Sequence, residues 1–172
     1  DLDAFAGARA EPLRLLANRG VNGIDGLVSS ALGAAQALPS PTVLWCGDLA
    51  LLHDVSGLLA GQLHAADLTI VVSNDDGGGI FEYLPVARAV PREMFEPLFA
   101  VPHGLDLCAL ARGLGWQATR VTSAEAFTAA LSHAVAGGLH VIEVPIDRAA
   151  NTALHAQLNE ALRSALHEEP AA

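Results

Sequence analysis

The sequence predicts an α/β domain in which helices cover both faces of a doubly wound parallel sheet. Short apolar runs typical of buried strands alternate along the chain with longer segments whose apolar residues recur at helical spacing. Such an alternation favours parallel strands joined by helical crossovers. The 172 residues, 52% of them hydrophobic, suffice to bury one core, so we expect a single domain.

The first half of the chain carries three predicted strands and two predicted helices. Residues 1–11 are polar and short of large apolar side chains, and we interpret them as a linker or the tail of a preceding element, with the domain itself at 12–169. The chain does not begin with methionine, so we expect it to be part of a longer protein. We predict strands at 13–17, 42–46 and 68–73 and helices at 24–38 and 51–64.

The second half continues the same order of elements after a long connection. Four prolines between residues 82 and 104 predict a loop with at most a short helix near 92–95. A loop of that length inside a domain is often functional. Beyond it we predict helices at 105–113, 124–136 and 149–167 and strands at 116–121 and 140–145.

Composition excludes several classes of partner. The net charge is −10 with only nine Lys and Arg residues, so no basic surface is predicted for nucleic acid or for an anionic membrane. No apolar run reaches the roughly 18–20 residues of a membrane span, and the first residues do not resemble a signal peptide, so we expect a cytoplasmic protein. Cys46 and Cys108 fit neither a disulfide framework nor a zinc site, and we expect both to be reduced core residues.

Two acidic segments follow neighbouring predicted strands. One is Gly47-Asp48-Leu49, and the other runs from Asn74 to Phe81 with the sequence Asn-Asp-Asp-Gly-Gly-Gly-Ile-Phe. Ligands of open α/β sheets bind at the carboxyl ends of the strands, so Asp48 and Asp75 are expected to face one crevice. Carboxylate oxygens beside glycine-rich backbone suit a magnesium ion that holds a diphosphate.

Ordinary structural roles could also account for these residue types. An Asp-Gly pair after a strand is usually a simple turn, and only the pairing with Asp48 favours a site at Asp75. The apolar side chains singled out below are core residues by default, and His53 beside Asp54 is more often a helix residue than a base. Two rival functions are a magnesium-dependent phosphoryl-transfer domain and a non-catalytic regulatory or assembly module of the same fold.

Three motifs in the same order resemble those of a known family. They are Asn18-Arg19-Gly20-Val21-Asn22-Gly23-Ile24-Asp25-Gly26, the segment from Gly47 to Asp54, and Gly77-Gly78-Gly79-Ile80-Phe81 followed by Leu84-Pro85. The Gly-Asp and Asn-Asp-x-Gly pair is similar to the metal and diphosphate motif of thiamine diphosphate enzymes. Together the motifs resemble the 2-succinyl-5-enolpyruvyl-6-hydroxy-3-cyclohexene-1-carboxylate synthases of menaquinone biosynthesis. The resemblance runs from about residue 13 to 166 and covers only the C-terminal third of those enzymes.

The resemblance implies a metal and a cofactor for this chain. Asp48, Asp75 and the carbonyl of Gly77 would bind Mg²⁺ or Mn²⁺, although the family more often has Asn at position 75, and Asn74 is the alternative ligand. Ile24 would wedge between the two rings of thiamine diphosphate and hold them bent. The implied cofactor-binding residues are Gly23, Ile24, Gly47, Asp48, Leu49, Ala50, Asp75, Gly77, Gly79, Ile80 and Phe81.

The resemblance also implies a reaction and partners. The family is a transferase that decarboxylates 2-oxoglutarate and adds the remaining succinyl semialdehyde unit to isochorismate. Arg19 would bind substrate carboxylates, and Ile80, Phe81 and Leu84 would form an apolar wall over the substrate. No catalytic residue is expected in this chain, because the activating Glu lies on an N-terminal domain of a neighbouring subunit. We therefore expect a homodimer or homotetramer, and an isolated chain that is inactive.

Overall fold

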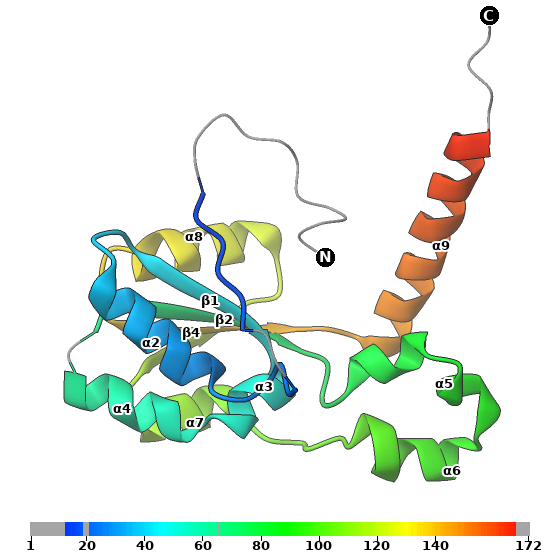
Figure 1. The fold of residues 1–172 in the computed structure, drawn as a ribbon, viewed down its shortest axis with the longest axis horizontal. Coiled ribbons are helices and arrows are strands. Elements are labelled where there is room, and N and C mark those ends of the chain that lie inside the picture. The colour runs from blue at the N-terminus through cyan, green and yellow to red at the C-terminus, as the bar shows by residue number, and fades with distance from the viewer. Residues whose placement is uncertain (1–12, 19–20, 65, 168–172) are drawn as a thin grey trace, which may run out of the picture.

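The computed structural model describes residues 13–18, 21–64 and 66–167, and within them four strands form one parallel sheet in the order β1-β2-β4-β3 (Figure 1). The pairing register aligns Gly47 with Ser73 and Asn74 with Pro145, so the carboxyl ends of β1, β2 and β4 meet at one edge. The strands are β1 at Thr42–Gly47, β2 at Leu68–Asn74, β3 at Gln117–Arg120 and β4 at Leu139–Pro145.

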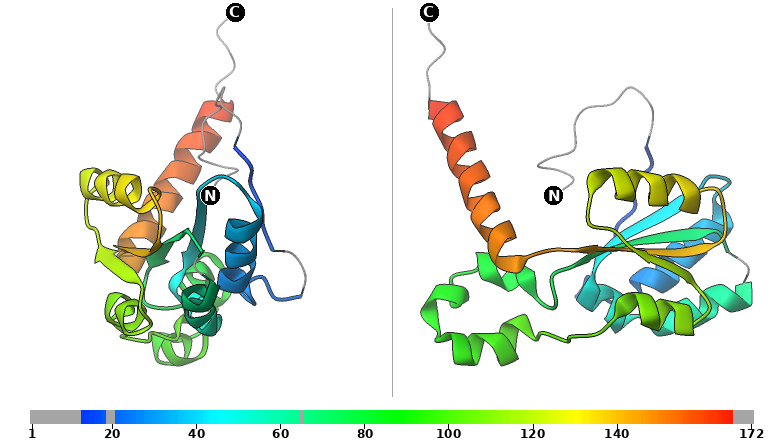
Figure 2. Two further views of the ribbon diagram at one scale, coloured as in Figure 1. Left: turned by 90° about the vertical axis from the view of Figure 1, so that its left-hand side faces the viewer. Right: turned by 180° about the vertical axis from the view of Figure 1, so that it is seen from behind.

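Helices cover both faces of the sheet, as predicted. The helices α2, α4 and α7 pack on one face and α8 packs on the other (Figures 1 and 2). The larger core lies on the three-helix face, where Leu58 and Leu107 pack with Ile70 and Val72 of β2. The helices around the sheet are α2 at Leu27–Ala37, α3 at Asp48–His53, α4 at Ser56–His64, α7 at Leu107–Gly113 and α8 at Ala124–Ala134.

The segment between β2 and α7 extends beyond the carboxyl ends of the strands (Figure 1). It was predicted as a loop with a short helix, and that helix is confirmed, but the rest is also built of short helical turns. Phe95 is fully buried there and stacks on Phe99, with ring centroids 5.6 Å apart. The turns are η1 at Gly79–Tyr83, α5 at Val86–Ala89, α6 at Arg92–Phe95 and η2 at Glu96–Ala100.

The last helix, α9 at Arg148–His167, projects away from the sheet (Figure 2). Two residues separate it from the end of β4, so its first residue lies at the same edge as the ends of β1 and β2. No helix in the described part of the chain has the length and hydropathy that crossing a membrane requires.

Three sequence predictions in the first half are wrong. Leu13–Ala17 forms no strand and is exposed, since no neighbour in the described chain pairs with it. The helix predicted from residue 24 begins at Leu27, because Gly26 before it has a left-handed conformation, with φ 65°. The helix predicted at 51–64 is two helices, because Asp54 leaves the helical conformation and binds the backbone N–H of Ser29 at 2.7 Å.

The predicted boundaries at 12–169 are not tested by the fold, and the linker predicted at 1–11 lies outside the described residues. Both cysteines are buried and unpaired, as predicted. Burial is also the main cause that raises the pKa of each thiol to about 12.

Candidate functional site

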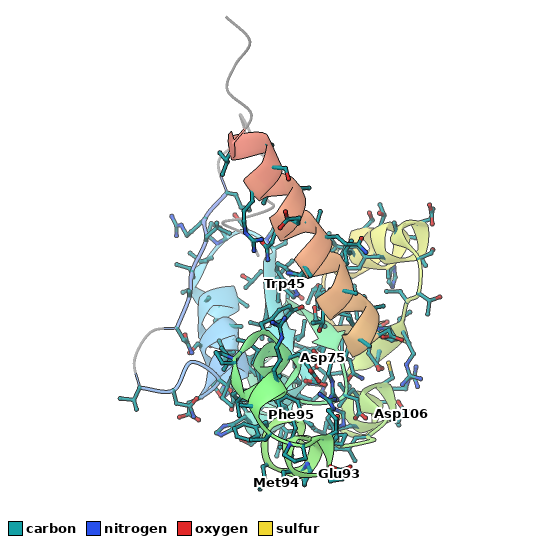
Figure 3. All side chains as sticks on the ribbon, turned by 90° about the vertical axis from the view of Figure 1, so that its right-hand side faces the viewer. Trp45, Asp75, Glu93, Met94, Phe95 and Asp106 are labelled. Atoms are coloured by element: carbon teal, nitrogen blue, oxygen red, sulfur yellow. The ribbon has the colours of Figure 1, made fainter. Side chains whose placement is uncertain are left out.

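The sheet register brings the two predicted acidic segments together. Gly47 pairs with Ser73, so Asp48 emerges beside the end of β2, and Asp75 follows that strand by one residue. Figure 3 views this end of the molecule, and Asp75 lies near its centre, between Trp45 above and Phe95 below. The sheet therefore places Asp48 and Asp75 at a shared edge, as the two strand ends predict.

Asp48 is a buried carboxylate at this edge, with 2% of its surface exposed. Its Oδ2 accepts the backbone N–H of Gly77 at 2.7 Å and lies 3.1 Å from Nε2 of His103, while its Oδ1 accepts the N–H of Leu49 at 2.6 Å. One side chain thus joins the start of α3, the loop after β2 and the segment before α7.

The Asp75 carboxylate lies close enough to Asp48 for the charge of Asp48 to affect its pKa. Partial burial raises the pKa of Asp75 first, and the negative charge of Asp48 raises it further. The Asp75 carboxylate accepts from the backbone of Gly79, where an added Cβ would overlap it. Two carboxylates in such a setting repel one another, and a divalent cation between them would relieve that repulsion.

Asn74 and Asp76 make structural contacts at the same strand end. Asn74 donates to Oε1 of Glu143 at 2.8 Å and accepts the N–H of Asp76 at 3.0 Å, so both functional atoms of its amide are engaged. Asp76 accepts the N–H groups of His103 at 3.0 Å and Gly104 at 2.7 Å, and the bond from Gly104 is the main cause that lowers its pKa. These contacts leave Asp75 as the better candidate ligand.

The backbone at Gly77 packs closely against the backbone of Ala100. Its φ of 130° is accessible mainly to glycine, and an added Cβ would overlap the carbonyl oxygen of Ala100. The neighbouring Gly78 donates its N–H to that same oxygen. The glycine run after Asp76 is therefore required where the loop packs against η2.

Arg148, at the start of α9, was not predicted as a site residue. Its guanidinium donates to the carbonyl oxygens of Asp75 at 3.3 Å and Asp76 at 2.7 Å, and it binds Glu96 at 3.2 Å. Its side chain is 16% exposed. It holds the loop after β2 against η2, and its place just beyond the end of β4 is the only sequence signal for this role.

Two open pockets flank Asp75. One, of about 320 Å³, lies at the ends of β2, β3 and β4 and includes Arg120 and Glu143 in its lining. The other, of about 650 Å³, lies between η1, α6 and α9 and includes Arg92 and Arg148. Asp48 lines neither, consistent with its burial behind His103 and Gly77. A ligand that reaches Asp75 therefore has room on either side.

The other predicted site residues differ in their burial, and one of them is not described by the structure. Arg19 lies outside the described residues, so its predicted contact with substrate stays a prediction. Ile24 packs against the three-helix core and is partly buried. Ile80 and Leu84 are exposed, at 71% and 46%, and Phe81 makes an edge contact with Phe99 at 6.0 Å. The predicted role of these residues as a wall over the substrate stays a prediction.

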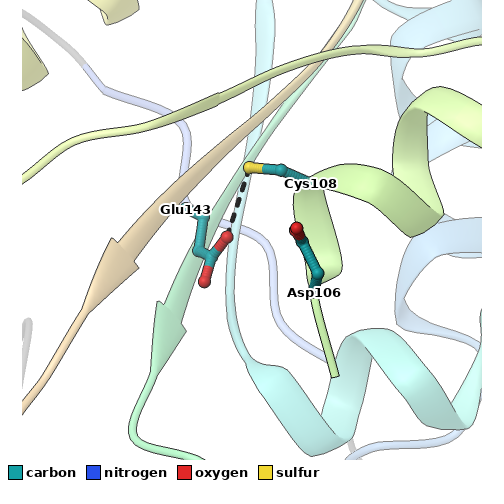
Figure 4. A group of neighbouring side chains, drawn as sticks. All are labelled: Asp106, Cys108 and Glu143. Carbon is teal, nitrogen blue, oxygen red and sulfur yellow. Dashed lines mark hydrogen bonds between the residues drawn. The ribbon is translucent and has the colours of Figure 1, made fainter. Parts of the chain in front are cut away.

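Glu143 is the centre of a second polar cluster, drawn with Cys108 and Asp106 in Figure 4. It is 1% exposed, and its carboxylate accepts from Asn74 at 2.8 Å, from Cys108 Sγ at 3.2 Å and from Arg120 Nε at 3.1 Å. Burial acts to raise the pKa of Glu143, but these hydrogen bonds hold it below the usual value. The cluster supports the end of β2 through Asn74.

Replacing Glu143 by Gln should destabilise the chain by about 1–3 kcal/mol, because the amide keeps one acceptor oxygen and turns an N–H₂ group toward donors that the other carboxylate oxygen now accepts. Urea unfolding at pH 7 measures this loss. Since the folded pKa is depressed, the stabilisation is present above the ordinary pKa of 4.5 and is lost as pH falls below it. The difference in the free energy of unfolding between wild type and Glu143→Gln should therefore become smaller at acid pH. Glu160→Gln, on the exposed face of α9, is the matched control and should change stability little.

Comparison with known proteins identifies a family that matches this chain. Residues 4–144 match the family described as thiamine pyrophosphate enzyme, C-terminal TPP binding domain. The chain is 49% identical over 170 residues to 2-succinyl-5-enolpyruvyl-6-hydroxy-3-cyclohexene-1-carboxylate synthase of Myxococcus xanthus, covering 99% of this chain and 29% of that protein. It is 48% identical over 155 residues to the synthase of the same name from Chloroflexus aurantiacus, covering 90% of this chain and 26% of that protein. The chain thus spans less than a third of the curated relatives it matches.

Solved structures give the same result for the fold. A benzoylformate decarboxylase from Polynucleobacter necessarius superposes with a TM-score of 0.61 at 25% identity, over 73% of this chain and 23% of that one. A thiamine diphosphate-dependent 4-hydroxybenzoylformate decarboxylase from Rhodococcus jostii RHA1 superposes with a TM-score of 0.58 at 25% identity, over 67% of this chain and 21% of that one.

Proposed function

The chain belongs to the family of C-terminal TPP-binding domains of thiamine pyrophosphate (thiamine diphosphate) enzymes, and from this membership we propose that it is the diphosphate- and metal-binding part of a 2-succinyl-5-enolpyruvyl-6-hydroxy-3-cyclohexene-1-carboxylate synthase. The observation that carries the proposal is the meeting of Asp48 and Asp75 at adjacent strand ends. The similarity to synthases of that name along 99% of the chain supports the choice of enzyme.

The residues at this edge fit a divalent cation. We assign the metal, Mg²⁺ or Mn²⁺, to Asp48, Asp75 and the carbonyl of Gly77, because hard oxygen ligands suit both ions. The engagement of Asn74 by Glu143 and Asp76 supports Asp75 as the second carboxylate. The N-cap residue Gly47 gives α3 no side-chain cap, and the N–H of Ala50 in the first turn is the proposed donor to the diphosphate, with Gly47 and Leu49 beside it. The N–H of Leu49 itself donates to Asp48 Oδ1.

The cofactor brings the reactive group, and the chain positions it. Thiamine diphosphate, when bound, supplies the electron sink that lets a 2-oxo acid lose CO₂. In the proposed assignment Ile24, with Gly23 beside it, supports the cofactor rings. Ile80, Phe81 and Leu84 exclude water from the substrate, which favours the loss of a charged carboxylate.

Part of the proposed site lies outside this chain. We place the Glu that activates the cofactor on an N-terminal domain of a neighbouring subunit, which makes the enzyme a homodimer or homotetramer. The substrates are 2-oxoglutarate and isochorismate. The family match supports this assignment over a phosphoryl-transfer domain. The position of Arg148 also supports it, because that cation is engaged by backbone carbonyls and Glu96 instead of facing a transferred phosphoryl group.

The test of this function is an assay of the complete enzyme that contains this chain. With thiamine diphosphate, Mg²⁺ and both substrates, we expect release of CO₂ from 2-oxoglutarate together with consumption of isochorismate and formation of the joined product. Parallel reactions that lack isochorismate, or that carry pyruvate in place of 2-oxoglutarate, are the controls. Equal turnover with pyruvate would contradict the proposed substrate, and no turnover with any 2-oxo acid would contradict the proposed reaction.

Arg19→Ala should lower kcat/KM of the complete enzyme by roughly ten- to a hundredfold, the value of a charge-assisted hydrogen bond to a substrate carboxylate, about 1.5–3 kcal/mol. Steady-state kinetics with each substrate varied in turn measures the effect. Arg14→Ala is the control, since Arg14 is exposed in the same part of the chain and is assigned no contact with substrate. A large loss of cofactor affinity with unchanged substrate kinetics would instead place Arg19 at the diphosphate.

A further inference from the structure

Resting on the proposed function, we propose that His103 is a positioning residue that orients the Asp48 carboxylate for the metal ion. His103 lies in the segment between η2 and α7. It is 55 residues beyond Asp48 in the sequence. Its side chain is 10% exposed, and its Nε2 lies 3.1 Å from Asp48 Oδ2. A largely buried imidazole thus contacts a buried carboxylate of the site.

The hydrogen bonds of His103 determine which ring nitrogen carries the proton. Its Nδ1 accepts the backbone N–H of Leu105 at 3.0 Å, so in the neutral ring Nδ1 holds a lone pair and the proton sits on Nε2. Nε2 therefore donates to Asp48 Oδ2. The backbone sets the tautomer, and the tautomer sets the direction of the bond to Asp48.

This bond leaves the two oxygens of Asp48 unequal. Oδ2 accepts from both His103 and the N–H of Gly77, which uses both of its lone pairs. Oδ1 accepts only the N–H of Leu49 among the described residues, which leaves a lone pair for a cation. Fixing the carboxylate in this way lowers the cost of ordering it when a metal binds, as outer contacts commonly do for metal ligands.

The proposed role of the His103 ring in orienting Asp48 can be separated from any role in holding the segment between η2 and α7 in place. The segment is already tied to the end of β2 through its backbone, because the N–H groups of His103 and Gly104 both donate to Asp76. Neither bond needs the imidazole. Removing the ring can therefore leave the loop in place and still release Asp48.

Two substitutions of His103 distinguish the contacts of the ring. His103→Gln carries an amide N–H at about the reach of Nε2, so it can still donate to Asp48. His103→Asn is shorter and cannot, but its carbonyl oxygen can accept the N–H two residues on, at Leu105, as Asn commonly does in turns. The Asn variant thus keeps the contact that supports the loop and loses the one that orients the carboxylate.

The experiment is a Mn²⁺ titration of the complete enzyme in the presence of thiamine diphosphate, followed by electron paramagnetic resonance of free and bound Mn²⁺. We expect His103→Asn to weaken Mn²⁺ binding by about 10–100-fold, the usual effect of losing an outer contact to a metal ligand. His103→Gln should restore binding to near the wild-type value, and the unfolding temperatures of the two variants should agree.

The outcomes separate this inference from the proposed function. If wild type binds Mn²⁺ and His103→Asn binds it equally well, the positioning role is overturned while the metal site stands. Equal weakening in the Asn and Gln variants would overturn the donor role of Nε2. If wild type with thiamine diphosphate binds no Mn²⁺, the proposed metal site fails, and the role of His103 fails with it.

Discussion

Asp48→Ala is expected to abolish Mg²⁺-dependent binding of thiamine diphosphate to the complete enzyme. The substitution removes a proposed metal ligand and leaves the N–H of Gly77 and the ring of His103 without the acceptor they share. Without this carboxylate the metal loses a charged ligand, and we expect the affinity to fall by at least about a hundredfold, which corresponds to about 2.8 kcal/mol. Isothermal titration calorimetry with Mg²⁺ present measures the change.

Two variants serve as controls for this result. Asp75→Asn should retain binding, because the amide keeps the oxygen that a metal requires. Asp67→Ala should also retain it, since Asp67 accepts the N–H of Gly138 at 2.6 Å in the same manner but at the opposite end of β2. A loss in Asp75→Asn as large as that in Asp48→Ala would contradict the ligand assignment.

The isolated 172-residue chain should fold but neither decarboxylate 2-oxoglutarate nor form the product with isochorismate. It spans less than a third of the length of the relatives it matches. It also lacks the proposed activating Glu, and a positioned acid or base of this kind typically raises a reaction rate by about 10²–10⁴-fold. It should also bind thiamine diphosphate weakly, because the rest of the cofactor's contacts are proposed to lie elsewhere in the enzyme. Circular dichroism and the same two-substrate assay test the two parts of this prediction.

Adding the N-terminal part of the same enzyme in trans is the matched experiment. We expect partial recovery of activity, since the site is proposed to form between subunits, and no recovery when the added part carries a substitution of its activating Glu. Turnover by the isolated chain near the rate of the complete enzyme would show that a residue of this chain does the activating. The proposed division of the site would then be wrong.

The fold was predictable where local sequence and tertiary packing agree. The strands β1 and β2 are continuous apolar runs, and their predicted bounds are right to one residue. Burial of both was also expected, but only β2 is buried, because β1 lies at the edge of the sheet and exposes Val43 and Trp45. Residues 13–17 are also mostly apolar but find no pairing partner in the described chain, so an apolar run alone was insufficient. The division between α3 and α4 depends on a contact of Asp54 with Ser29, which periodicity does not reveal.

The candidate site divides in the same way. Asp48 and Asp75 could be found because each follows a strand, and parallel neighbours bring such positions together. His103 and Arg148 could not, since they reach the site only when η2 and α9 pack against the loop after β2. The length of the connection that contains His103 was the one sequence signal that it carries a function.

The most direct test of the central proposal is a calorimetric titration of the complete enzyme with thiamine diphosphate, once with Mg²⁺ and once with the metal removed by a chelator. We predict saturable binding with Mg²⁺ and its loss without metal, because in the proposed assignment Asp48 and Asp75 contact the diphosphate only through the cation. Binding of equal affinity in both conditions, or no binding in either, would contradict the assignment of this chain as the metal- and diphosphate-binding part of the enzyme.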